Sequence, residues 1–321
     1  IDQKGSEAHE LMELVSGEED DVILVNPSSD NNVSFNFFST SSDEGDKVFE
    51  KEVKNITSGF ISLANLDDGL KMKEVSESIL QILIRASENY TPLYFYDTVS
   101  SKGSLESFTT EFEEELSDSE VKLLRDVEED ILEQIQRRVN PFIENADLKT
   151  ITSTQSPSHT IGDLVKNGKN IVVDFSEISD AEVKRVATAS ITNQIWSVVQ
   201  NRRHIGSDKY DPYALVLEDI ETVNSSTVPI SDILSEARSL KMSVILTGNH
   251  PDQLETSVMN AIENNCLNLL FSDLGTPSKA EEIVSADPEK LLNLNKYQYI
   301  NKTSNENSVD NKFNTFAQIQ K

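Results

Sequence analysis

The second half of the chain alternates short, continuously apolar runs with amphipathic helical segments. The apolar runs occupy residues 170–175, 213–217, 243–247 and 267–272, and polar turn residues bound each of them. An unbroken apolar run of this length is typical of a strand that is covered on both faces, as strands of parallel sheets are. Strands that alternate with helices in this way predict an α/β fold, in which helices cover a mostly parallel sheet.

The first forty residues fit the same alternation. Ile1 and Asp2 have the pattern of a strand end before a turn, residues 9–15 carry apolar side chains at helical spacing, and residues 21–25 form an apolar strand. We therefore expect residues 1–40 to be the first part of the α/β core. Because the chain begins inside a predicted strand, we also expect it to be a piece of a longer protein.

Residues 41–158 change to the 3.6-residue period of amphipathic helices. One apolar face comprises Met72, Val75, Ile79, Ile82, Leu83 and Ala86, and a second comprises Val121, Leu124, Val127, Ile131, Ile135 and Val139. Ser117 and Glu120 have the spacing of a capping box that starts the second helix. The pattern predicts an all-helical subdomain inserted into the core.

The core is expected to resume over residues 159–300. It would contain a long helix, which begins with a second capping box formed by Ser179 and Glu182. Residues 301–321 are polar and rich in Asn, which predicts a linker or a loosely docked arm.

The net charge limits the partners of such a chain. Its 321 residues include 56 Asp and Glu against 28 Lys and Arg, a formal net charge of −28. Such a surface repels nucleic acid at ordinary salt. It either faces a cationic partner or belongs to a protein that works in molar salt, where charge repulsion is screened. The acids are spread along the chain instead of forming one block, which favours a halophilic protein.

Cysteine content and hydropathy indicate the compartment. Cys266 is the one cysteine in the sequence, so no disulfide can form within the chain and an oxidising compartment is not indicated. No apolar run approaches the ~18 residues of a membrane span. We expect a cytoplasmic protein, held at the cytoplasmic face of the membrane if a segment outside this chain anchors it.

Paired acids follow the apolar run 213–217. Ligands of parallel sheets bind at the carboxyl ends of the strands, where Glu218 and Asp219 stand. One carboxylate there can hold Mg²⁺ through its water shell while its neighbour polarises an attacking water. The alternative is that Asp219 or Glu221 only caps the next helix.

Asn249 and Arg238 are further candidates. Asn249 follows the strand 243–247, and its amide can donate to a phosphate oxygen and orient water; alternatively it is a turn residue. Arg238 lies on the preceding helix, where its guanidinium suits a terminal phosphate of a neighbouring subunit. An ion pair with Glu236 or Asp232 is the simpler interpretation of Arg238.

Several common sites are excluded. The phosphate loop G-x-x-x-x-G-K-[ST] is absent, and the similar stretch 162–170 has one residue too many between its glycines and precedes a strand. The four histidines, His9, His159, His204 and His250, lack the spacing of zinc ligands. No nucleophile motif of the G-x-S-x-G type occurs.

Taken together, these segments resemble the HerA/FtsK superfamily of P-loop ATPases, in particular conjugative coupling proteins of the TraG/TraD type and type IV secretion ATPases. The resemblance covers most of the core. Its elements are the D-x-K-G segment at Asp2–Gly5, the turn after Asn26, the strand within 167–176, the acid pair Glu218-Asp219, the segment 234–238 with Arg238, the polar residue Asn249, and the segments 262–266 and 291–297.

The resemblance implies a RecA-like core that binds ATP and Mg²⁺, assembles as a homo-hexamer and acts on DNA, with a membrane or secretion-channel partner. By the same resemblance, Asp219 polarises water, Glu218 holds magnesium with Asp219 through water, Asn249 senses the terminal phosphate, Arg238 reaches the neighbouring subunit, and Asp2, Lys4 and Gly5 bind the nucleotide. The phosphate loop would lie upstream of Ile1, so this chain alone is expected not to hydrolyse ATP.

Three departures from the family pattern concern the site. The acid pair is inverted to Glu218-Asp219, the sensing residue is Asn249 in place of Gln, and Ala237 replaces the glycine before Arg238. Three functions therefore stay open: a DNA-translocating motor, a secretion, pilus or virion-assembly ATPase that acts on protein, and a degenerate assembly subunit that does not hydrolyse ATP.

Overall fold

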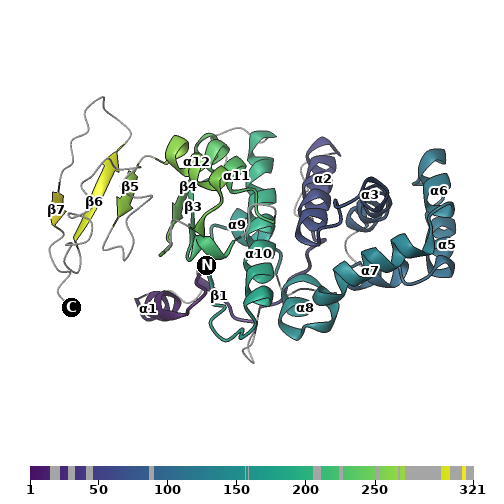
Figure 1. The fold of residues 1–321 in the computed structure, drawn as a ribbon, viewed down its shortest axis with the longest axis horizontal. Coiled ribbons are helices and arrows are strands. Elements are labelled where there is room, and N and C mark those ends of the chain that lie inside the picture. The colour runs from purple at the N-terminus through teal and green to yellow at the C-terminus, as the bar shows by residue number, and fades with distance from the viewer. Residues whose placement is uncertain are drawn as a thin grey trace.

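The structure, a computed structural model, describes residues 1–14, 22–27, 33–40, 46–86, 90–155, 157, 159–204, 211–223, 227–249, 253–266, 268–271, 298–303 and 313–315. Figure 1 shows three parts side by side along the longest axis. Parallel strands and their helices form the middle part, an all-helical part lies on one side, and a small antiparallel sheet lies on the other. The helix-covered, mostly parallel α/β core predicted from the sequence is confirmed.

The central strands form two parallel pairs. Strand β1 (Val22–Val25) pairs with β2 (Asn170–Val173), and β3 (Tyr213–Leu217) pairs with β4 (Met242–Leu246). The apolar runs that predicted strands at residues 170–175, 213–217 and 243–247 thus form strands in the expected parallel orientation.

Ile1 and Asp2 lie between these two pairs. The Asp2 nitrogen donates to the carbonyl of Val173 at the end of β2 (2.8 Å), and the Ile1 carbonyl accepts from the nitrogen of Glu218 just after β3 (3.2 Å). The order across the middle part is therefore β1, β2, Ile1-Asp2, β3 and β4. This placement confirms the predicted strand end and brings the turn after Asp2 to the carboxyl edge of β3.

The middle part also contains the helices α1 (Ser6–Leu14), α9 (Ile161–Lys166), α10 (Ala181–Asn201), α11 (Ile230–Glu236) and α12 (Thr256–Asn265), with the short 3₁₀ helices η2 (Arg202–His204), η4 (Ile220–Thr222) and η5 (Ala237–Leu240). The predicted box at Ser179 is wrong, because Asp180 caps α10 by accepting from the nitrogens of Glu182 and Val183 (2.8 and 3.3 Å). Asp180 stands one residue closer to the helix, and the Glu182 carboxylate pairs with Arg185 instead.

The all-helical part comprises α2 (Asp46–Leu63), α3 (Leu70–Arg85), α4 (Pro92–Thr98), α5 (Lys102–Glu111), α6 (Asp118–Arg125), α7 (Glu129–Glu144) and α8 (Ala146–Thr152). The fully buried Phe60 of α2 stands at its centre, with ring contacts to Phe37, Phe38, Phe95 and Phe142. Helix α2 packs against α10, so the helical part and the core share one continuous hydrophobic core.

The predicted helical faces are largely confirmed. Ser117 and Glu120 form the expected capping box at the start of α6. The face from Val121 to Val139 is divided between two helices, however, because α6 ends at Arg125 and α7 begins at Glu129. Ala86, the last residue of the other predicted face, is an exposed helix end.

The last predicted strand does not join the parallel sheet. Strand β5 (Asn268–Phe271) pairs antiparallel with β6 (Gln298–Thr303), which pairs antiparallel with β7 (Phe313–Thr315). The prediction of a parallel strand at 267–272 is therefore wrong in orientation, and two short strands extend into the predicted polar tail. An apolar run marks a strand, but its neighbours decide the orientation.

One face of the β3–β4 pair is open. Val216 and Ile245 are partners in register on this face, and they are 38% and 51% exposed. Parallel strands are usually covered on both faces, so this apolar surface is unusual. In the described part of the chain, no helix is long and apolar enough to cross a membrane.

Candidate functional site

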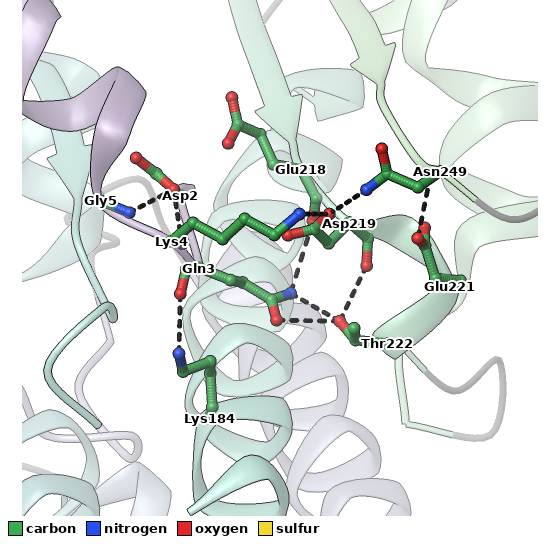
Figure 2. Close-up of polar contacts among 10 residues, drawn as sticks. All are labelled: Asp2, Gln3, Lys4, Gly5, Lys184, Glu218, Asp219, Glu221, Thr222 and Asn249. Atoms are coloured by element: carbon green, nitrogen blue, oxygen red, sulfur yellow. Dashed lines mark hydrogen bonds and ion pairs between the residues drawn. The ribbon is translucent and has the colours of Figure 1, made fainter. Parts of the chain in front are cut away.

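Asp219 stands at the centre of a polar cluster at the carboxyl end of β3. Its backbone is left-handed (φ 48°, ψ 51°), a conformation that costs a non-glycine residue of the order of 1–3 kcal/mol but that Asp adopts more readily than most. The following residue, Ile220, donates to Thr247 beyond β4 (2.9 Å) and so fixes the turn. The left-handed turn presents the Asp219 carboxylate to Lys4 and Asn249 (Figure 2).

Lys4 and Asn249 both bind the same oxygen of Asp219. The Lys4 Nζ lies 2.6 Å from Asp219 Oδ1, and the Asn249 Nδ2 donates to Oδ1 at 3.0 Å. The predicted site residues Lys4, Asp219 and Asn249 are therefore brought together from the N-terminal turn, from β3 and from β4. Their grouping follows from the parallel strand order, which aligns the carboxyl ends of neighbouring strands at one edge.

Glu221 also belongs to the cluster, although its place in the sequence predicts only a helix cap. Its Oε1 accepts a hydrogen bond from the Asn249 nitrogen (2.9 Å), while its Oε2 is buried and has no hydrogen-bond partner among the described residues. Gly248 lies so close that a Cβ there would stand 2.5 Å from Glu221 Oε2. The glycine therefore lets the strand end approach this carboxylate.

The D-x-K-G turn is held by its own aspartate. The buried Asp2 carboxylate accepts from the nitrogens of Lys4 (2.7 Å), Gly5 (2.7 Å) and Ala8 (2.9 Å), which fixes the turn and the start of α1. Gly5 has φ +85°, a conformation that favours glycine. The structure thus gives Asp2 and Gly5 a role in positioning Lys4, while their predicted contact with a nucleotide stays a prediction.

A second layer of contacts supports the site. The Gln3 Nε2 donates to the Thr222 hydroxyl (2.7 Å), and Lys184 of α10 donates to the Gln3 carbonyl (2.7 Å) (Figure 2). No motif identified in the sequence specifies Gln3, Thr222 or Lys184. Only the strand order, which is not visible in the sequence, places Gln3 next to the turn after β3.

Two predicted site residues lie apart from the cluster. Figure 2 shows the Glu218 side chain directed away from Asn249 and Glu221, although its backbone belongs to the same strand end. Arg238 is an exposed residue of η5, which precedes β4 and so lies at the opposite edge of the sheet from Asn249. Among the described residues, Arg238 forms neither of the alternative ion pairs, with Glu236 or with Asp232, and Glu236 pairs with Arg203 instead.

The cluster is strongly acidic. The hydrogen bond to Asp219 and the charges of Asp219, Glu221 and Glu218 raise the pKa of Lys4 above its usual value. The carboxylates of Glu218, Asp219 and Glu221 thus all act on the Lys4 ammonium. The Lys4 side chain is 61% exposed, so its ammonium can move away from Asp219 and remain hydrated.

The donor set fits a magnesium nucleotide. Among the described residues, no three His, Cys, Asp or Glu side chains cluster as ligands of a metal ion. Magnesium usually binds one or two carboxylates and takes its other ligands from water and phosphate. The carboxylate of Asp219, which accepts from Lys4 and Asn249, suits this mode of binding.

The geometry defines an α/β protein with an acidic, lysine-containing site at the carboxyl edge of a parallel sheet. No protein-family model and no curated protein matches the sequence. Solved structures do match the fold. The plasmid coupling protein TrwB in complex with a non-hydrolysable GTP analogue is similar over 88% of this chain and 71% of its own, with a TM-score of 0.58 and 12% identity.

Two further structures support the same fold. TrwB in complex with a non-hydrolysable ATP analogue is similar over 94% of this chain and 76% of its own (TM-score 0.58, 14% identity). VirB4 of Thermoanaerobacter pseudethanolicus is similar over 94% of this chain and 84% of its own (TM-score 0.52, 13% identity). The resemblance expected from the motifs, including its RecA-like core, is confirmed at the level of the fold.

Proposed function

We propose that this chain is part of an ATP-driven motor of the coupling-protein kind, which moves DNA between cells or in a related transfer process. The observation that carries the proposal is the meeting of Lys4, Asp219, Asn249 and Glu221 at one strand end. The similarity of the fold to TrwB, whose structures hold nucleotide analogues, supports nucleotide binding at this edge.

The residues of the cluster suit phosphoryl transfer in distinct ways. Lys4 carries a mobile positive charge that can follow the phosphates, and the Asn249 amide can donate to a terminal phosphate oxygen. Asp219 would hold Mg²⁺ through water, and the bound ion would neutralise the charge of the phosphates. Arg238 is exposed at the opposite edge, and by the resemblance it would reach a neighbouring subunit of a hexamer.

By the resemblance, the phosphate loop would come from outside residues 1–321. We infer that the segment carrying it packs on the open face of the β3–β4 pair, because Val216 and Ile245 leave an apolar surface there next to the cluster. Residues 41–158 would form the inserted subdomain that recognises the substrate or a partner. An anchor at the cytoplasmic face of the membrane would likewise lie outside this chain.

The proposal is tested with the full-length protein, in high salt, by measuring ATP hydrolysis with and without DNA. We expect hydrolysis that DNA stimulates, and we expect Asp219→Asn to lower it about 100-fold or more. Asn tolerates the left-handed backbone at this position, so the loss would report the missing charge and not a distorted turn. Unchanged hydrolysis in this variant would remove Asp219 from the site.

A second function rests on the fold similarity to VirB4. If the full-length protein hydrolyses ATP and DNA has no effect on the rate, a secretion ATPase that acts on protein becomes the better proposal. Nucleotide binding without any hydrolysis would instead favour the degenerate assembly subunit.

A further inference from the structure

Two glutamates, Glu218 and Glu221, lie close to Asp219 in the sequence at the end of β3. Their side chains have different surroundings. Glu218 belongs to the adjacent acid pair that the motif highlights. Glu221 stands two residues after Asp219 on the short helix η4. Because a strand alternates the direction of its side chains whereas a turn redirects them, adjacency in sequence does not decide which glutamate joins the site.

Asn249 links Glu221 to Asp219. Its side-chain amide donates to Asp219 Oδ1 (3.0 Å) and its backbone nitrogen donates to Glu221 Oε1 (2.9 Å). Asn249 thus holds the carboxylates of Asp219 and Glu221 through its side chain and its backbone, respectively. The Glu218 carboxylate is directed away from this group (Figure 2).

The two oxygens of Glu221 have different surroundings. Oε1 is satisfied by Asn249, while Oε2 is buried without a hydrogen-bond partner among the described residues. A buried carboxylate oxygen without a partner is costly, so such an atom marks a place where a ligand or water binds. By contrast, Asp219 Oδ1 accepts from both Lys4 and Asn249, so it is already occupied by two donors.

We propose that Glu221, and not a member of the adjacent pair Glu218-Asp219, is the catalytic base of this site. This inference rests on the proposed ATPase function. The water oxygen forms a bond to the γ-phosphorus as the bond from that phosphorus to the β,γ-bridging oxygen breaks. ADP leaves with the electrons of the broken bond, and the water proton passes to Glu221 Oε2 and later to solvent.

The same geometry allows a simpler role for Glu221, as an anchor for the Asn249 nitrogen. Glu221→Gln separates the two roles. The glutamine carbonyl still accepts the hydrogen bond from Asn249, but its amide cannot take a proton. Glu218→Gln is the matched control, because it removes the same charge from the same strand end.

The experiment uses the full-length protein at high salt and measures ATP hydrolysis, binding of a fluorescent ATP analogue, and thermal unfolding for the wild type and both variants. We expect Glu221→Gln to lower the hydrolysis rate about 100-fold or more, the usual contribution of a general base, while nucleotide affinity and melting temperature stay near wild type. Glu218→Gln should lower the hydrolysis rate far less than Glu221→Gln does, because the Glu218 carboxylate is directed away from Asn249 and Glu221.

A second readout follows the bound nucleotide instead of the steady-state rate. With hydrolysis blocked, Glu221→Gln should retain intact ATP after rapid desalting, whereas the wild type should release ADP. If Glu218→Gln abolishes hydrolysis and Glu221→Gln does not, the assignment is wrong while the ATPase function stands. A wild type that binds ATP without hydrolysing it contradicts the ATPase function itself, so the two failures can be told apart.

Discussion

Lys4 and Asp219 are separated by 215 positions in the chain, yet their side chains form the shortest link of the site. The cause is the pairing of Ile1 and Asp2 between β2 and β3, which brings the following turn to the carboxyl edge. Buried strands followed by polar residues predicted Asp219 and Asn249. Lys4 was predicted only through the family resemblance, because nothing in its own surroundings in the sequence marks a site.

Gly5 offers a direct test of the turn that positions Lys4. Its φ is +85°, and a Cβ there would lie 2.7 Å from the Ser176 Cβ, an atom that cannot rotate away. We expect Gly5→Ala to lower the free energy of unfolding by about 2 kcal/mol or more, the sum of left-handed strain and overpacking. Urea denaturation measures the change.

Gly168→Ala is the control for this effect. Gly168 also has a positive φ (+67°), but a Cβ there meets nothing within 4 Å. Gly168→Ala should therefore lower the free energy of unfolding only by the strain of the left-handed backbone, about 1 kcal/mol. Equal losses in the two variants would show that the contact with Ser176 is not tight in solution.

Among the helices, an ion pair joins α2 to α3. Arg85 donates from Nε to Glu50 Oε1 (3.0 Å) and from Nη2 to Oε2 (2.9 Å), and these hydrogen bonds lower the pKa of Glu50. Both side chains are more than one third exposed, so solvent screening limits the pair to about 0.2–1 kcal/mol. We expect Glu50→Gln to lower the free energy of unfolding at pH 7 by that amount.

The pH dependence of this loss follows from the sign of the shift. A carboxylate whose pKa is lower in the folded state stabilises the protein above its unfolded pKa, and this stability is lost as the pH falls through the folded pKa. The difference between wild type and Glu50→Gln should therefore vanish under acid conditions. Denaturation curves between pH 7 and pH 3 measure it. Glu77→Gln is the weak-pair control, because Glu77 Oε1 lies 3.8 Å from Lys73 Nζ. A difference that persists in acid would indicate lost packing instead.

The predictions for individual elements succeeded where local physics decides and failed where neighbours decide. The capping box at Ser117 is purely local, and it is present as predicted. The orientation of β5 depends on β6, whose pairing no pattern within the strand reveals. The same holds for Glu221, whose role as a site residue depends on the approach of Asn249 from another strand.

At the scale of the whole molecule, the excess of acids should make stability depend on salt. The net charge is −28, and exposed acidic runs such as Glu113 to Glu115 and Glu128 to Asp130 lie on the helical part. Like charges repel in the folded state, where they are closest together, and salt screens this repulsion. Pairs such as Arg85 with Glu50 are also screened, but they are few against 56 acids and 28 bases.

We therefore expect the urea midpoint at pH 7 to rise as KCl is increased from 0.1 to 2 M. The steepest part should lie below 1 M, because the screening length falls from about 10 Å at 0.1 M to about 3 Å at 1 M. Near the isoelectric point, about pH 4.4, the net charge approaches zero and the same salt series should change the midpoint little. A rise of equal size at both pH values would point to a general effect of salt on apolar burial. A cationic partner would then be the better explanation of the acidic surface.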